Sequence, residues 1–249
     1  MHYAGTPRAV RFLERPNRYL AVVEDRRSGE RILAHVPNPG RMTELLLPGR
    51  TAGWVIPIEN PTERKTRFDF VSVVSGRTLV SIDSRIANRL VHRALARGAL
   101  RMFGRGQWHA EVGWKDCRFD FARRSGGAID TLLEVKSSNL RLGRSASFPD
   151  APTLRGTHHV ERLTEATREG VAAGLLIMVQ RTDIDDFVPN VAMDPPFARA
   201  VDRAHAAGVR IAARTMRVFP DRVEWGRPVP VRNGPEERRF LPSTGPSAP

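Results

Sequence analysis

Short apolar stretches separated by turn residues fill the first 83 residues, and this pattern constrains the fold more than any other feature of the chain. The stretches are rich in β-branched and aromatic residues and lie at Val10–Leu13, Tyr19–Val23, Arg31–Val36, Gly53–Ile58, Phe68–Val74 and Thr78–Ile82. Segments such as Arg-Pro-Asn, Ser-Gly and Pro-Asn-Pro-Gly separate them. Short strands bounded in this way are typical of a small β-barrel, of which the oligonucleotide-binding (OB) fold is one candidate. We therefore predict a barrel domain over residues 1–83.

The pattern changes after this domain, and the remaining chain alternates helices with strands. Ser84 can cap a helix over residues 84–98, which we take as a connector. Further strands are predicted at His109–Lys115, Cys117–Ala122, Thr131–Ser137, Leu175–Gln180 and Val209–Val218, and further helices at about 156–169 and 197–207. The fold class predicted is α+β, with the barrel followed by an α/β domain over residues 84–226 around a mixed central sheet. Residues 227–249 are rich in Pro, Ser and Gly, so we predict a disordered tail there.

Charge narrows the choice of partner. The 249 residues include 40 Lys and Arg against 27 Asp and Glu, a formal net charge of +13. Such an excess attracts polyanions and favours nucleic acid as a partner, with ribosome-like or membrane-surface partners as alternatives. No apolar run approaches the roughly 18 residues of a membrane helix, and the N-terminus lacks a secretory apolar segment, so a cytoplasmic location without a membrane partner is expected. The single cysteine, Cys117, excludes an internal disulfide.

Asp120, Glu134 and Lys136 form the strongest candidate site. They lie on two predicted strands joined by a Gly-rich turn, and a hairpin centred on Gly127 places Asp120 opposite Glu134, with Lys136 on the same face. Two opposed carboxylates repel each other unless a cation lies between them. Lys136 could supply that charge, or Mg²⁺ could, and a bound Mg²⁺ would hold a phosphodiester and activate water. The alternative interpretation is a surface ion pair on a solvent-facing strand.

Two basic groups are candidates for phosphate binding. Arg85, Arg89 and Arg93 recur every four residues and share one side of the predicted helix, which is either a row of phosphate contacts or an ordinary solvated face. Arg155 and His159 lie at a helix N-terminus, where the dipole and unpaired N–H groups favour a phosphate; capping plus a solvated histidine is the alternative. No glycine-rich nucleotide-binding motif occurs, so a nucleotide cofactor is not expected.

The Asp…Glu-x-Lys hairpin resembles the core of the PD-(D/E)xK nuclease superfamily. The stretch from Ser147 to His159, which contains Arg-Gly-Thr-His-His, and the Pro-Asn-Pro-Gly-Arg-Met stretch ending at Met42 resemble the sugar fermentation stimulation protein A family more narrowly. Asp83-Ser84 and Leu154 depart from that family's pattern. The resemblance implies an OB-type barrel followed by a nuclease-like domain, DNA binding, and a link to the regulation of sugar metabolism.

Carried over by position, the resemblance and the charge pattern define three sets of candidate residues. The catalytic candidates are Asp120, Glu134 and Lys136. The metal-ligand candidates are Asp120 and Glu134, with Glu111 on the preceding strand as a third. The DNA-binding candidates are Arg41, Arg64, Lys65, Arg85, Arg89, Arg93, Arg155 and His159.

These observations predict a cytoplasmic DNA-binding protein of the sugar fermentation stimulation type. It would hold double- or single-stranded DNA mainly through arginine–phosphate contacts, with little readout of base sequence. A Mg²⁺-dependent nuclease acting through Asp120, Glu134 and Lys136 is the alternative, and an RNA-binding factor is a third possibility. Whether the chain is an enzyme therefore stays open, and Mg²⁺ is the one cofactor that the sequence suggests.

Overall fold

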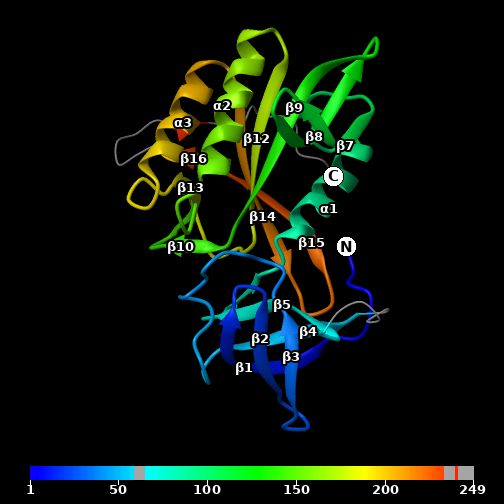
Figure 1. The fold of residues 1–249 in the computed structure, drawn as a ribbon, viewed down its shortest axis with the longest axis vertical. Coiled ribbons are helices and arrows are strands. Elements are labelled where there is room, and N and C mark those ends of the chain that lie inside the picture. Colours follow the sequence, from blue (N-terminus) through cyan, green and yellow to red (C-terminus); the bar gives the residue numbers. More distant parts are fainter. Residues whose placement is uncertain (59–64, 233–238, 241–249) are drawn as a thin grey trace. The chain divides into compact units, whose positions relative to one another are not determined.

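The computed structural model describes residues 1–58, 65–232 and 239–240 (Figure 1). The chain divides into two units, each with its own hydrophobic core. Unit 1 comprises Met1–Ala87, Gln180–Asp183 and Thr215–Gly226, and unit 2 comprises Asn88–Val179, Ile184–Arg214 and Arg227–Pro249. Unit 1 thus includes two short segments from far along the chain in addition to the residues predicted to form a barrel.

The strands of unit 1 form a closed barrel. They are β1 (Arg8–Asn17), β2 (Leu20–Asp25), β3 (Arg31–His35), β4 (Ala52–Pro57), β5 (Phe68–Ser75) and β6 (Thr78–Ser81). They pair in the order β3-β2-β1-β4-β5-β6, and a parallel pairing of β3 with β5 closes the first five strands into a barrel. The other pairings between neighbours are antiparallel. The predicted OB-like barrel is confirmed.

Close packing inside the barrel explains one glycine. Phe12 of β1 and Phe70 of β5 are buried and stack with ring centroids 6.3 Å apart. A Cβ at Gly53 on β4 would lie 2.6 Å from the Phe70 ring and 2.4 Å from the carbonyl oxygen of Ser72. No larger residue fits there without moving a neighbouring strand, so glycine at this position lets β4 lie against β5.

Unit 2 is built on a mixed sheet, as predicted. Its strands are β7 (Trp108–Trp114), β8 (Cys117–Ser125), β9 (Ala128–Ser138), β12 (Ala172–Val179), β14 (Arg210–Val218) and β15 (Val223–Val229), in the order β15-β14-β12-β9-β8-β7. β7, β8 and β9 form an antiparallel meander, and β12 runs parallel to β9. β14 and β15 each cross from one unit to the other along the chain.

A second sheet was not predicted from the sequence. It consists of β10 (Leu140–Leu142), β11 (Ser145–Phe148), β13 (Asp186–Pro189), β16 (Val231–Arg232) and β17 (Arg239–Phe240). Part of the predicted disordered tail therefore forms strands, because Val229 and Val231 lie buried in the core of unit 2 despite the polar residues around them. Residues 233–238 and 241–249 of that tail lie outside the described residues.

The helices are α1 (Arg85–Ala96), α2 (Leu154–Arg168), α3 (Pro195–Ala206) and the short 3₁₀ helix η2 (Arg101–Phe103). α2 and α3 lie side by side, and both contribute to the core of unit 2 (Figure 1). The hydroxyl of Thr153 caps α2 by accepting a hydrogen bond from the Gly156 N–H at 3.0 Å. Asp194 caps α3 and also accepts from the Thr153 N–H at 2.7 Å, so one carboxylate joins the starts of the two helices.

None of these helices, within the part of the chain that the structure describes, has the length and apolar character needed to cross a membrane.

Candidate functional site

The β8–β9 hairpin brings the predicted acidic residues into one part of unit 2. The pairs farther from the turn follow the register predicted around position 127: Phe121 with Leu133, Ala122 with Leu132 and Arg123 with Thr131, whereas the register shifts by one residue between Arg123 and Arg124. Beyond these pairs, one carboxylate oxygen of Asp120 accepts a hydrogen bond from the Val135 N–H at 2.8 Å. The other accepts from the side-chain amide of Asn88 at 2.6 Å. Asp120 therefore connects the hairpin to α1.

Glu134 lies opposite on β9, and its side chain is almost entirely buried. One carboxylate oxygen, Oε1, receives two hydrogen bonds, from Lys136 Nζ at 2.5 Å and from the His159 ring at 2.7 Å. His159 comes from α2, where Gly156 and Thr153 form the tight first turn. The predicted placement of Lys136 beside Glu134 is thus present, and α2 adds an imidazole that we had expected to face a phosphate.

The hydrogen bonds of His159 define which ring nitrogen carries the proton. Nε2 accepts a hydrogen bond from Arg155 Nε at 3.3 Å, so the proton of a neutral ring lies on Nδ1 and is donated to Glu134. Arg155 itself is exposed at the start of α2. The chain of contacts therefore runs from a solvent-facing guanidinium through an imidazole to a buried carboxylate.

The two carboxylates titrate differently because their surroundings differ. Burial, together with the charge of Glu134, raises the pKa of Asp120 to about 6, against the weaker opposing effects of the Val135 N–H, Lys136 and Asn88. Burial also acts to raise the pKa of Glu134, but the hydrogen bond from His159 and the charge of Lys136 outweigh it and leave that pKa below its ordinary value. At neutral pH both groups are ionised, and the ionisation of buried Asp120 lowers the stability of the folded protein.

The second oxygen of Glu134 shows whether a cation fits this site. Oε2 is buried and has no hydrogen-bond partner among the described residues. A buried carboxylate oxygen without a partner is unfavourable, and two neighbouring carboxylates add repulsion to that cost. A hard divalent cation such as Mg²⁺ or Ca²⁺ takes carboxylate oxygens as ligands. Asp120 and Glu134 therefore fit such an ion, and they are the residues that would hold it.

Glu111 does not join this pair. It lies on β7 with its side chain 57% exposed and forms an ion pair with Arg118 at 2.9 Å. Its backbone adopts a positive φ of 55°, and Glu111 itself is not among the paired residues of the β7–β8 ladder. Within residues 1–58, 65–232 and 239–240, Asp120, Glu134 and Glu111 do not form a group whose carboxylate oxygens all lie within 4.8 Å of one another.

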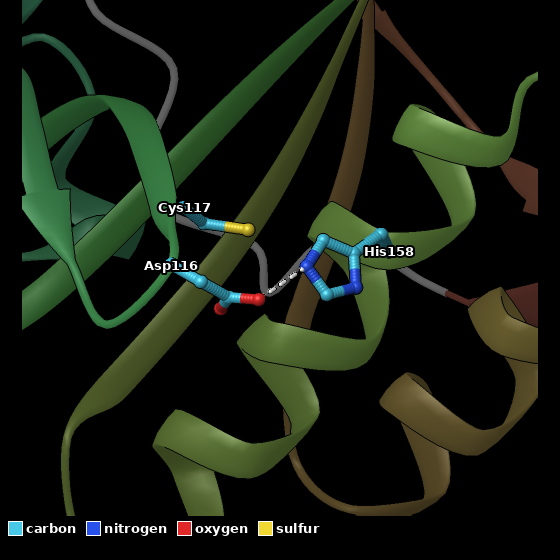
Figure 2. A group of neighbouring side chains, drawn as sticks. All are labelled: Asp116, Cys117 and His158. Atoms are coloured by element: carbon cyan, nitrogen blue, oxygen red, sulfur yellow. Dashed lines mark hydrogen bonds and ion pairs between the residues drawn. The ribbon is translucent and has the colours of Figure 1, made fainter.

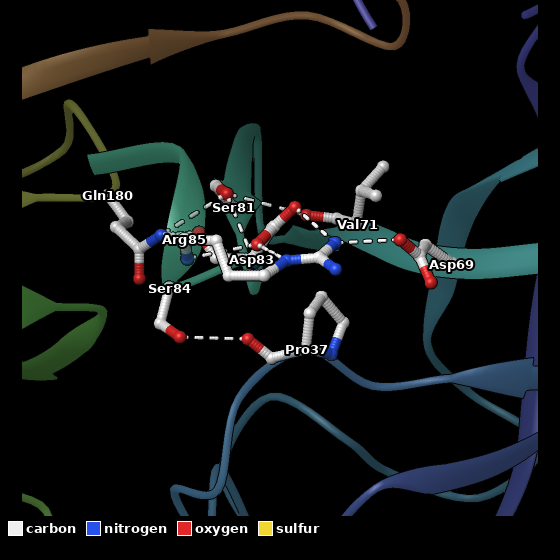
Figure 3. A network of polar contacts seen from close by, with 8 residues as sticks. All are labelled: Pro37, Asp69, Val71, Ser81, Asp83, Ser84, Arg85 and Gln180. Carbon is white, nitrogen blue, oxygen red and sulfur yellow. Dashed lines mark hydrogen bonds and ion pairs between the residues drawn. The ribbon is translucent and has the colours of Figure 1, made fainter. Parts of the chain in front are cut away.

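Arg85 is held by acidic residues of unit 1 (Figure 3). Its guanidinium contacts Asp83 at 2.9 Å and Asp69 at 2.7 Å, and Asp83 is only 1% exposed. Asp83 also accepts a hydrogen bond from the Arg85 backbone N–H at 3.0 Å, whereas the Ser84 hydroxyl donates to the carbonyl oxygen of Pro37. The side chain at the start of α1 that bonds to the helix is therefore Asp83 rather than Ser84. A phosphate would have to compete with two carboxylates for Arg85.

The other predicted phosphate contacts lie in different settings. Arg89 and Arg93 are exposed on α1, and neither forms an ion pair with any described residue. Arg41 and Lys65 are exposed in unit 1. Arg64 lies outside the described residues. Their contacts with DNA stay predictions.

A second group of side chains was missed by the sequence analysis. The imidazole of His158 contacts the carboxylate of Asp116 at 2.9 Å, and the sulfur of Cys117 lies beside them (Figure 2). Neighbouring residues of a helix point in different directions, and here His158 faces Asp116 whereas His159 faces Glu134. No spacing rule could have revealed the group, because His158 is 42 residues from Asp116.

The fold and the carboxylate pair place the chain among proteins that join an OB-type barrel to a mixed-sheet α+β domain. Two family models match it in that order. The model of the SfsA N-terminal OB domain matches residues 13–82, and the model of the sugar fermentation stimulation protein RE domain matches residues 85–222. The chain belongs to the sugar fermentation stimulation protein (SfsA) family.

Individual relatives agree with this assignment. A sugar fermentation stimulation protein homolog of Clostridium tetani is 37% identical over 221 residues, covering 88% of this chain and 94% of that protein. The homolog of Moorella thermoacetica is 39% identical over 222 residues, covering 89% and 94%. A solved structure of Pyrococcus furiosus SfsA in complex with Ca²⁺ superimposes with a TM-score of 0.82 at 24% identity, covering 93% of this chain and 98% of the other.

Proposed function

We propose that this protein binds DNA through the phosphate backbone, with unit 2 supplying the main contacts. The observation that carries the proposal is the net charge of +13, together with exposed arginines on the two helices that contact the carboxylate pair. Asn88 of α1 donates a hydrogen bond to Asp120 of that pair, and Arg89 and Arg93 follow on the same helix. α2 contributes His159, with Arg155 one turn earlier. Cationic side chains therefore lie on both helices that contact the pair.

The start of α2 adds a second attraction for phosphate. The first backbone N–H groups of a helix have no partner within the helix, and the helix dipole favours an anion there. Thr153 satisfies the N–H of Gly156, and Arg155 stands beside it. None of these groups distinguishes one base from another, so the binding should tolerate changes of DNA sequence.

The salt dependence of binding tests this proposal. If about five phosphates are neutralised, the logarithm of the binding constant should fall with the logarithm of salt concentration at a slope of about −4.5. Fluorescence anisotropy with a labelled duplex and a labelled single strand measures this slope. A flat salt response, or no retention of either DNA at about 50 mM salt, would refute the proposal.

Matched charge variants test which surface is used. The double variant Arg89→Gln/Arg93→Gln removes two exposed cations and should reduce the slope by about 1.8. The control, Arg144→Gln/Arg203→Gln, removes the same charge from residues already paired with Asp185 and Glu161. The control should keep nearly the full slope. Equal slopes for the two double variants would show that α1 is not part of the interface.

A metal-dependent nuclease is the second candidate, and one observation favours it. The buried Glu134 Oε2 has no partner among the described residues, and it belongs to a carboxylate pair that carries Lys136 beside it. A divalent cation, when bound, polarises a phosphodiester and makes a bound water more acidic. Asp120 and Glu134 would hold the ion, and Lys136 would offset negative charge near the phosphate. The Ca²⁺ complex of the Pyrococcus furiosus relative supports a divalent cation on this fold.

Cleavage separates the two candidates. Labelled DNA and labelled RNA of the same sequence are incubated with wild type, Glu134→Gln and Lys136→Gln, with and without Mg²⁺ or Mn²⁺. Metal-dependent cleavage that is lost in both variants would establish the nuclease. Binding without cleavage would leave a nuclease-like domain that holds DNA, and stronger retention of RNA than DNA would favour the RNA-binding alternative. In metal-free protein Glu134→Gln should bind DNA as well as wild type or slightly better, because it removes a negative charge.

A further inference from the structure

Three different metal-ligating side chains converge in unit 2, away from the carboxylate pair. Asp116 and Cys117 lie where the β7–β8 turn meets β8, and His158 lies in the first half of α2. One carboxylate oxygen, one ring nitrogen and the sulfur all lie within 4.8 Å of one another. Figure 2 shows the thiol and the carboxylate projecting from the turn toward the imidazole ring.

The separation of the Asp116 oxygen and the His158 nitrogen is close to that of two ligands of a tetrahedral ion, and the Cys117 sulfur lies within 4.8 Å of both atoms. Zn²⁺ binds sulfur at about 2.3 Å and nitrogen or oxygen at about 2.0–2.2 Å, so two ligand atoms in a tetrahedral site lie about 3.4–3.6 Å apart. The Asp116 oxygen and the His158 nitrogen are 2.9 Å apart, and they need to separate by only about half an ångström to admit the ion. The ion would then replace the hydrogen bond that joins them.

The donor set selects the class of metal. Thiolate and imidazole are ligands of Zn²⁺ and related transition-metal ions, whereas Mg²⁺ and Ca²⁺ prefer oxygen ligands alone. Cys117 is 7% exposed, but the side chains of Asp116 and His158 are 53% and 42% exposed. The ion can therefore reach the group from solvent, and the buried thiol would be its innermost ligand.

Arg162 contacts both oxygens of the Asp116 carboxylate. Its Nε lies 2.7 Å from Oδ1, and its Nη2 donates a hydrogen bond at 3.1 Å to Oδ2, the oxygen that contacts His158. Its charge is offset by an ion pair with Glu165, three residues further along the same helix. Arg162 therefore fixes the direction of the carboxylate, and an ion bound to Oδ2 would replace the hydrogen bond from Nη2 while the contact with Oδ1 stays.

We propose that Asp116, Cys117 and His158 bind one Zn²⁺-class ion, with water completing the tetrahedron. The ion joins the β7–β8 turn to α2, in addition to the contacts of Asp116 with His158 and Arg162 and the ion pair of Lys115 with Glu165. Because His158 precedes His159, the ion also restrains the turn of helix that presents His159 to Glu134. The three ligands are different residues from those proposed to contact DNA and from the cation ligands Asp120 and Glu134, so the metal site can be tested by itself.

Cobalt spectroscopy tests the proposal directly. Full-length protein stripped with EDTA is titrated with Co²⁺, and a cysteine ligand gives an intense near-ultraviolet charge-transfer band that oxygen ligands do not give. The band should appear at one equivalent, disappear on addition of Zn²⁺, and be absent in Cys117→Ser. Glu134→Gln should retain it, since that variant alters only the carboxylate pair. A wild-type spectrum without the band would overturn the assignment.

Affinity provides the second measurement. Zn²⁺ should bind His158→Gln at least about 100-fold more weakly than wild type, whereas His205→Gln, on α3, should bind normally. His158 is half exposed, so this variant should fold even if Cys117→Ser does not, and circular dichroism checks both. Zn²⁺ should also raise the unfolding temperature of wild type but not of His158→Gln. Equal Zn²⁺ affinity in wild type and His158→Gln would refute the site.

Discussion

Replacing Asp120 by asparagine should stabilise the metal-free protein at neutral pH, and the reason lies in its burial beside Glu134. The folded protein holds the pKa of Asp120 at about 6, against an ordinary value of 3.8. Each pKa unit corresponds to about 1.4 kcal/mol, so ionising Asp120 in the folded state costs about 3 kcal/mol at pH 8. An amide has no charge to ionise, and its oxygen can still accept from the Val135 N–H.

The sign follows from proton binding. Below pH 3.8 Asp120 is protonated in both the folded and unfolded states, and the group costs nothing. Between pH 3.8 and about 6 the folded state binds more protons than the unfolded state, so stability falls as the pH rises. The stability advantage of Asp120→Asn over wild type should therefore be about 2.4 kcal/mol larger at pH 8 than at pH 4.

Urea unfolding in EDTA at several pH values measures this difference. Of the four tryptophans, Trp108 and Trp114 lie on β7 beside β8, so a Trp54→Phe/Trp225→Phe background makes fluorescence report on unit 2. Asp185→Asn is the control, because Asp185 is exposed and its pKa is lowered by Arg144. That variant should show no gain at pH 8.

Adding Mg²⁺ or Ca²⁺ should then reduce the stability advantage of Asp120→Asn. A cation between Asp120 and Glu134 relieves the repulsion in wild type, and Asp120→Asn removes one of its ligands. The advantage of the variant should shrink or vanish at high cation concentration. The reasoning fails if Asp120→Asn has the same advantage at pH 4 and pH 8, or if it is less stable than wild type throughout.

Two further substitutions test the barrel of unit 1. Gly53→Ala should cost about 1–3 kcal/mol of stability, because the new methyl would lie 2.4 Å from the carbonyl oxygen of Ser72. The control Gly113→Ala, which has open space around the new methyl, should cost less. Equal urea midpoints for the two variants would contradict this packing argument. Asp83→Ala leaves the partly buried Arg85 without its main partner and the start of α1 without its cap, so unit 1 should lose about 3 kcal/mol in urea unfolding. An unchanged midpoint for Asp83→Ala would mean that Arg85 is solvated rather than paired.

Local pattern accounts for the parts of this protein that the sequence predicts well. Apolar, β-branched stretches interrupted by Gly, Pro and Asn predicted the six strands of unit 1 close to their observed places. A hairpin centred on Gly127 predicted Asp120 opposite Glu134, and the pairs from Phe121–Leu133 to Arg123–Thr131 follow that register, although it shifts by one residue nearer the turn. In the C-terminal segment, by contrast, the polar composition predicted disorder although Val229 and Val231 are buried, because their burial depends on strands far away in the sequence.

Chemistry that depends on packing between distant elements was decided by the tertiary structure alone. Arg85 and Arg89 follow one periodic pattern along α1. Asp69 and Asp83 form ion pairs with Arg85, whereas no described residue forms an ion pair with Arg89. His158 and His159 are neighbours, yet one meets Asp116 on a turn and the other meets the buried Glu134. Sequence determines which face of a helix or strand a side chain occupies, because that follows from backbone geometry. Which partner stands opposite that face depends on how whole elements pack. That packing produces the raised pKa of Asp120, the Asp116–Cys117–His158 group, and the Glu134 oxygen that has no partner among the described residues.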